Sequence, residues 1–185
     1  MRVISGTRQG THLKSFKGRK IRPTSDRVKE ALFNIIKQYI AEDTKVLDLF
    51  AGTGNLAIEA LSRGADKAYL VEKDRESLSI IRENIKLCRF QEEVEIIPLD
   101  VKKAIPGLGK KGGGFDIIFI DPPYDTGLAA ETLELLGEST LSEKALVVAE
   151  CSAREILEER YGKLVLKDIR RYGDTSLSFF ERGVD

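Results

Sequence analysis

The most restrictive feature of the sequence is a short apolar run, Ile117 to Ile120, that stops abruptly at Asp-Pro-Pro-Tyr. A continuous run of β-branched and aromatic residues is typical of a strand buried on both faces of a parallel sheet. Because two prolines cannot continue a strand ladder, Asp121 to Tyr124 are expected to form a stiff loop where that strand ends. Ligands of open α/β sheets bind at this edge. The run therefore predicts an α/β fold and the place of its site.

The same loop has the groups that hold a planar amino group. Asp121 and the carbonyl of Pro122 can accept its two hydrogens, and Tyr124 can stack on the attached ring. The same residues would also fit a strand that is followed by a proline turn with a purely structural role. The tetrapeptide alone does not decide between these interpretations.

A glycine loop follows an earlier strand-like run, 45–50. Gly52 and Gly54 allow a tight turn and a close approach of the backbone to a ligand. Such loops occur in folds that bind nicotinamide, flavin or methyl-donor cofactors, so the loop by itself is a weak signal. Asp48 precedes the glycines, and Glu72 ends a second strand, where a carboxylate can accept both hydroxyls of a ribose. Together they favour a nucleoside-containing cofactor.

Strands and helices alternate along the chain with short loops between them. This order implies right-handed crossovers and a doubly wound, Rossmann-like sheet of seven strands, mostly parallel, with helices on both faces. The turn at 170–174 joins two alternating segments, which predicts one antiparallel strand near the sheet edge. The segment from Pro106 to Gly114 is expected to be a flexible link. The predicted strands are 45–50, 68–71, 94–99, 117–120, 145–149, 163–169 and 175–180, and the predicted helices are 24–40, 74–87, 125–136 and 153–160, with one more after the glycine loop.

Acidic residues lie at the carboxyl ends of four successive strands: Asp48, Glu72, Asp100 and Asp121. Since parallel strands end at the same edge of a sheet, these four side chains are expected to lie there, at what we call the carboxyl edge. An acid after a strand is often only a helix cap, so each one alone is ambiguous. Four together favour a binding site.

Positive charge is concentrated at the start of the chain. Residues 1–29 hold nine Lys or Arg against one acid, a net charge of +8, and the whole chain is neutral, so the remainder carries −8. Residues 1–22 alternate weakly between glycines, which predicts a small basic hairpin attached to a domain over 23–185. The asymmetry favours a polyanionic partner, although a solvated leader would have the same composition. The cofactor pocket is expected to be built after Lys45, without help from this arm.

Other classes of protein find little support in the composition. Cys88 and Cys151 lie far apart without metal-ligand spacing, and His12 is the single histidine, so we expect no metal site and no histidine-based triad. The apolar runs are too short to span a membrane, and the basic start is unlike a signal peptide. These features predict a cytoplasmic monomer.

Taken together, the motifs resemble those of class I S-adenosylmethionine-dependent methyltransferases that modify exocyclic amino groups. Three further segments, 22–34, 60–65 and 172–175, are similar to the RsmD family, bacterial guanine-N2 methyltransferases of small-subunit ribosomal RNA. The likeness covers nearly the whole chain. Ala57 stands where that family often has Gly, and Lys29 where it often has Arg.

The resemblance implies an enzyme that uses S-adenosylmethionine and no metal, with ribosomal RNA or a small-subunit assembly particle as its partner. Adenine-N6 or cytosine-N4 methylation is the first alternative, and an NAD-dependent oxidoreductase or a non-catalytic RNA-binding module is a more remote one. The residues implied for catalysis are Asp121, Pro122 and Tyr124, those for the cofactor are Asp48, Gly52, Gly54, Glu72 and Asp100, and those expected to contact RNA are Arg8, Lys14, Lys17, Arg19, Lys20, Arg22, Arg170 and Arg171.

Overall fold

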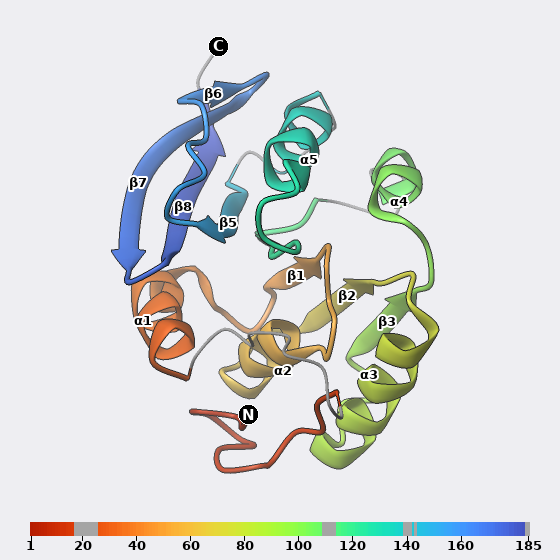
Figure 1. Ribbon diagram of the computed structural model, residues 1–185. Helices are drawn as coiled ribbons and strands as arrows, with labels where there is room; N and C mark the ends of the chain where they lie inside the picture. The colour runs from red at the N-terminus through yellow and green to blue at the C-terminus, as the bar shows by residue number, and fades with distance from the viewer. Residues whose placement is uncertain (17–25, 109–113, 139–141, 143, 184–185) are drawn as a thin grey trace.

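One eight-stranded sheet forms the centre of the computed structural model, which describes residues 1–16, 26–108, 114–138, 142 and 144–183 (Figure 1). The strand order is β3-β2-β1-β4-β5-β8-β7-β6, with β1 to β5 parallel and β8 antiparallel to both of its neighbours. The strands are β1 (Lys45–Asp48), β2 (Lys67–Val71), β3 (Val94–Ile97), β4 (Ile117–Ile120), β5 (Leu146–Ser152), β6 (Arg160–Tyr161), β7 (Leu164–Tyr172) and β8 (Thr175–Arg182).

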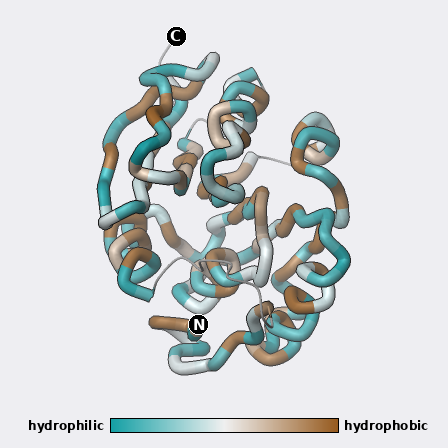
Figure 2. The backbone as a smooth tube through the Cα atoms, in the orientation of Figure 1, coloured by the Kyte–Doolittle hydropathy of each residue, from teal (hydrophilic) through white to brown (hydrophobic). Residues whose placement is uncertain are grey.

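Helices cover both faces of this sheet, and each face has its own hydrophobic core. α1 (Asp26–Ile36), α2 (Asn55–Ser62) and α3 (Arg75–Cys88) pack on one face, and α4 (Val101–Leu108) and α5 (Leu128–Gly137) on the other. A short 3-10 helix, Lys37–Tyr39, follows α1. Hydrophobic and hydrophilic residues alternate along the helices (Figure 2), as expected for helices with one buried face. The predicted doubly wound fold is confirmed.

The strand count and one helix differ from the predictions. The sheet has eight strands instead of seven, because the two-residue β6 pairs with β7. The helix predicted over 153–160 is absent, and turns lead the chain into β6 instead. Leu157 is buried, and the Glu158 N–H donates to the Tyr161 hydroxyl at 3.0 Å. These tertiary contacts outweigh the helix propensity of a charged segment.

A helix also replaces part of the predicted link over 106–114. α4 ends at Leu108 and includes Pro106. Four of its side chains are buried at helical spacing, and that burial offsets the cost of proline inside a helix, about 3 kcal/mol. Residues 109–113 lie outside the described part of the chain.

The N-terminal segment, residues 1–16, forms the predicted small hairpin and packs on the domain. Arg2 and His12 make an antiparallel bridge, and the Val3 N–H donates to the Thr11 carbonyl at 3.0 Å. Val3 and Leu13 are buried in the hydrophobic core that also contains residues of α1, α2 and α3. The predicted start of the first helix, Thr24, lies outside the described residues. In the described part of the chain, α1 begins at Asp26.

In the part of the chain that the structure describes, no helix combines the length and the hydrophobicity needed to cross a membrane.

Candidate functional site

The strand register brings the four predicted acids to the carboxyl edge. Asp48 pairs with Leu70 on one side and with Phe119 on the other, so β1, β2 and β4 end together. Glu72 and Asp121 directly follow β2 and β4. Asp100 follows β3 after a two-residue connection. The opposite edge, where the parallel strands begin, is called the amino edge below.

The glycine loop between β1 and α2 has the backbone that its sequence predicts. Gly52 and Gly54 have φ angles of 54° and 77°, in the left-handed region that side chains rarely adopt. A Cβ atom added to Gly54 would lie 3.3 Å from the Leu70 side chain. The loop therefore turns tightly into the start of α2, a favourable place for ligand groups.

Glu72 is fixed between β2 and this loop. One carboxylate oxygen accepts from the Gly52 N–H at 2.9 Å, and the other accepts from the N–H groups of Lys73 and Asp74, each at 2.8 Å. Three backbone donors thus hold the carboxylate in one orientation. A carboxylate has about four acceptor positions, so it can still accept from a ligand.

A pocket of about 70 Å³ adjoins Glu72. Its walls combine apolar side chains with two acids and two lysines, a composition that suits an aromatic ring with attached polar groups. The lining residues are Leu49, Phe50, Val71, Glu72, Lys73, Leu99, Asp100, Val101, Lys102, Leu128 and Thr132.

Asp48 lies beneath the glycine loop and is almost completely buried. Burial raises the pKa of its carboxyl to about 7, although the backbone N–H groups of Ala57 and Phe50 act in the opposite direction. Among the described residues its Oδ1 has no hydrogen-bond partner. A buried acceptor without a donor is costly, so this atom is suited to a ligand that brings a positive charge or an N–H group.

Asp100 lies at the mouth of the pocket and is partly exposed. Its Oδ2 accepts from the Lys73 Nζ at 2.8 Å, and its Oδ1 accepts from the Lys102 N–H at 3.0 Å. The lysine hydrogen bond lowers the pKa of Asp100, which keeps the carboxylate charged. The pair links the ends of β2 and β3 across the pocket lining.

The proline loop after β4 is anchored through Tyr124. Its hydroxyl donates to Glu150 Oε1 at 2.9 Å and lies 3.0 Å from Thr175 Oγ1. Burial raises the pKa of Tyr124 well above its ordinary value, so the phenol stays protonated. The aromatic ring is thereby held at the edge beside Asp121.

Sequence reasoning missed the two residues that anchor this ring. Glu150 lies near the end of β5, next to Ala149, which pairs with Ile120. It therefore repeats the pattern of an acid at a strand end that identified the other four acids. Thr175 begins the antiparallel β8; it belongs to the segment 172–175 that resembles the RsmD family, but nothing in that segment indicates a contact with Tyr124.

The predicted RNA contacts at the N-terminus lie apart from the proline loop or outside the described residues. Arg8 donates from Nε to the carbonyl of Cys88 at 2.6 Å and covers the Phe90 ring at 5.3 Å. Cys88 is the last residue of α3, which runs back from the carboxyl edge, so Arg8 lies at the amino edge. Lys14 forms an ion pair with Glu83. Lys17, Arg19, Lys20 and Arg22 lie outside the described residues.

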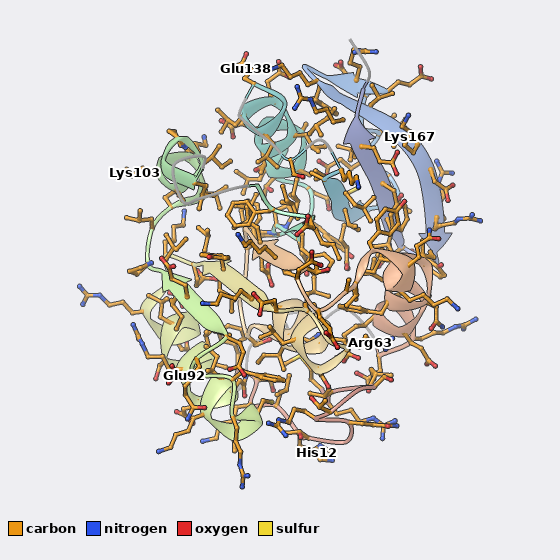
Figure 3. The ribbon with its side chains drawn as sticks, turned by 180° about the vertical axis from the view of Figure 1, so that it is seen from behind. His12, Arg63, Glu92, Lys103, Glu138 and Lys167 are labelled. Atoms are coloured by element: carbon orange, nitrogen blue, oxygen red, sulfur yellow. The ribbon has the colours of Figure 1, made fainter. Side chains whose placement is uncertain are left out.

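The two C-terminal arginines lie near the carboxyl edge. Arg171 pairs with Ser176, and the turn beyond them adjoins the end of β5, where Ser152 pairs with Thr175. Arg171 is exposed, and Arg170 donates to Asp168 at 2.8 Å. His12 is an exposed residue of the hairpin, at the opposite end of the view from Lys167 of β7 (Figure 3).

The fold, the glycine loop and the row of acids together define a Rossmann-like methyltransferase. The family described as Conserved hypothetical protein 95 matches residues 1–181. The chain belongs to this family, and its predicted RsmD type is confirmed by the relatives that follow.

A Bacillus subtilis (strain 168) protein named "Putative rRNA methyltransferase YlbH" is 37% identical over 183 residues, which cover 98% of this chain and 99% of that protein. The Ribosomal RNA small subunit methyltransferase D of Escherichia coli (strain K12) is 36% identical over 151 residues, 81% of this chain and 74% of that protein. The structure of a hypothetical protein from Thermus thermophilus superposes with a TM-score of 0.85 at 28% identity, covering 98% of this chain and 99% of that one.

Proposed function

We propose that this chain transfers a methyl group from S-adenosylmethionine to the exocyclic N2 amino group of a guanine in small-subunit ribosomal RNA. The observation that carries the proposal is the adjacency of two sites at one edge: the pocket beside Glu72 and the proline loop beside Asp121. Relatives named as small-subunit ribosomal RNA methyltransferases support the substrate class.

The pocket residues fit the proposed cofactor. Glu72 would accept from the ribose hydroxyls, and the apolar wall beside Asp100 would hold the adenine. The orphaned Oδ1 of Asp48 would gain a partner from the cationic amino acid part of the cofactor, directly or through a water molecule. When bound, the cofactor supplies an electrophilic methyl group, so the reaction needs no metal.

The proline loop would prepare the nitrogen that receives this group. A nucleobase amino nitrogen is a poor nucleophile because its lone pair is delocalised into the ring. Asp121 and the carbonyl of Pro122 would accept its two N–H groups, favouring a pyramidal nitrogen with its lone pair aimed at the methyl carbon. When the nitrogen receives the methyl group, Asp121 would take the proton that the nitrogen loses.

The target base must leave its stack to reach this loop. Tyr124 is fixed through Glu150 and Thr175, so its ring would be a rigid surface on which the base stacks. This role of Tyr124 requires no rearrangement of the edge. Positioning and preorganised hydrogen bonds are the contributions that the described residues offer.

Contacts with the RNA backbone would come from basic side chains near this edge. Arg170 and Arg171 lie near the end of β7, before the turn that adjoins the end of β5. Arg8 and Lys14 already have protein partners, so in our proposal they contribute less than Lys17, Arg19, Lys20 and Arg22. The partner is ribosomal RNA or an assembling small-subunit particle.

The test is methyl transfer from labelled S-adenosylmethionine to unmodified small-subunit ribosomal RNA, followed by nucleoside analysis of the product. We expect one N2-methylguanosine per RNA molecule. N6-methyladenosine or N4-methylcytidine would change the target base while keeping the reaction class. Binding of NAD without methyl transfer to RNA or to small-subunit particles would overturn the proposal.

A further inference from the structure

A buried side chain on α3 connects the N-terminal segment to the glycine loop. Asn84 has no exposed surface. Its Oδ1 accepts from the Lys14 N–H at 2.7 Å, and its Nδ2 donates to the carbonyls of Lys14 and Thr53 at 3.1 and 2.9 Å. Thr53 lies between the two glycines of the loop. One amide therefore holds both segments at once.

A second buried side chain makes the same kind of connection from α1. Lys29 Nζ donates to the carbonyl of Arg2 at 2.6 Å and to the Asn55 Oδ1 at 2.7 Å. Asn55 is the first residue of α2, directly after Gly54. Burial lowers the pKa of Lys29, and the carboxylate of Glu59, 3.1 Å away, opposes that effect.

Glu59 completes the connection on α2. Its buried carboxylate accepts from the N–H groups of Ile4 and Ser5 at 2.8 and 3.0 Å, and from the Arg63 Nε at 2.8 Å. Without the N-terminal segment, this charge and that of Lys29 would lose donors and acceptors in a buried environment, which is strongly destabilising. The pocket beside Glu72 is lined by residues after Lys45, as expected, whereas the glycine loop and the first residue of α2 are connected to the N-terminal segment through Asn84 and Lys29.

We propose that the N-terminal segment is a working part of the cofactor site, an inference that rests on the function proposed above. Asn84 and Lys29 are its positioning residues: they hold Thr53 and Asn55, on either side of Gly54, in the conformation that faces the ligand. Docking of the segment and binding of the cofactor then stabilise each other, because coupling between two binding events is reciprocal.

This reciprocity is measurable in the unaltered full chain by hydrogen exchange with and without saturating S-adenosylhomocysteine. The informative amides belong to Ile4, Ser5 and Lys14, which donate to Glu59 and Asn84. We expect their exchange to slow by about fivefold or more on binding, within the usual range of coupling. The Leu166 amide, which donates to Glu159 near the amino edge, is the control and should not change. Unchanged exchange at all three amides in the bound protein would overturn the inference.

A pair of variants provides an independent test. Asn84→Ala removes the connection to Thr53, whereas Cys88→Ala shortens another fully buried side chain of α3 and leaves the loop contacts intact. We expect Asn84→Ala to weaken S-adenosylhomocysteine binding about tenfold and Cys88→Ala to leave it within about twofold of the parent, both measured below their unfolding midpoints.

Parent-like affinity in folded Asn84→Ala would contradict the positioning role. If this variant does not fold, the exchange experiment decides alone. A parent protein that binds no S-adenosylhomocysteine would overturn the proposed function itself. Binding without protection of the three amides would overturn only the role of the segment.

Discussion

The two halves of the carboxyl edge are held by different kinds of contact. In the cofactor half, Glu72 and Asp100 accept from N–H groups of residues one or two positions further along the chain, and also from the Gly52 N–H and the Lys73 Nζ. In the base half, Tyr124 is oriented by Glu150 and Thr175, which are 26 and 51 residues away and come from β5 and β8. The acids of the cofactor half are thus held partly by their own neighbours in the chain, and its glycine loop is held by α3 and α1, whereas the base half depends on the antiparallel end of the sheet.

This difference separates two functions in our account. Changes in the cofactor half should weaken cofactor binding, and changes in the base half should slow methyl transfer while leaving cofactor binding intact. Each of the following predictions tests one side of this division.

The largest effect is expected from Asp121→Ala. Loss of an acceptor used mainly in the transition state should slow single-turnover methylation by at least about 10²-fold. S-adenosylhomocysteine affinity, measured by calorimetry, should stay within about threefold of the parent. If Asp121→Ala methylated RNA near the parent rate, Asp121 would have only a structural role in the turn.

Glu72→Ala should have the opposite profile. Loss of charged hydrogen bonds to the ribose is expected to weaken cofactor binding by about 2 to 3 kcal/mol. Glu92→Ala is the matched control, because Glu92 is an exposed acid that precedes β3 at the amino edge (Figure 3). If the two variants bound the cofactor with equal affinity, Glu72 would not be a ribose ligand.

Asp48 should make stability depend on pH. Its pKa is about 7 in the folded chain and about 4 when unfolded, so the folded state binds more protons between these values. The free energy of unfolding should therefore fall by about 2.5 kcal/mol as pH rises from 5 to 7.5. Asp48→Asn should flatten this profile in urea titrations, and an equally steep profile in the variant would assign the effect to another group.

Tyr124→Phe tests the long-range anchor. Without the hydroxyl, the ring loses its contacts with Glu150 and Thr175, and methyl transfer should slow by about fivefold or more, since a typical hydrogen bond contributes about 1 kcal/mol. Cofactor affinity should not change. Tyr161→Phe removes a hydroxyl bonded to the Glu158 N–H in the chain segment at β6 and should not affect transfer. The same loss of activity in both variants would indicate a general effect on stability.

The smallest effect concerns the RNA backbone. If Arg171 contacts one phosphate, Arg171→Gln should reduce the slope of log affinity against log salt by about 0.7 to 0.9. Lys163→Gln is the control, because Lys163 is exposed just before β7 at the amino edge. If the slope for Arg171→Gln equalled that of the parent, Arg171 would not contact an RNA phosphate.

The sequence predicted those features that depend on local patterns. Each of three features can be recognised from a few consecutive residues: the buried run at Ile117, the glycine loop and the acids at strand ends. The strand register then brings them together. The helix predicted over 153–160 failed because the burial of Leu157 and a hydrogen bond to Tyr161 decide that segment. Thr175 and the contacts of Asn84 could not be predicted, since pairing between distant segments leaves no local signal.

The most direct test of the division is single-turnover methylation by Glu72→Ala and Asp121→Ala over a range of S-adenosylmethionine concentrations. Saturating cofactor should restore Glu72→Ala to within about threefold of the parent rate, because its defect is in binding. Asp121→Ala should stay at least about 10²-fold slow at every concentration. Recovery of Asp121→Ala at high cofactor, or a Glu72→Ala defect that saturation does not relieve, would contradict the account.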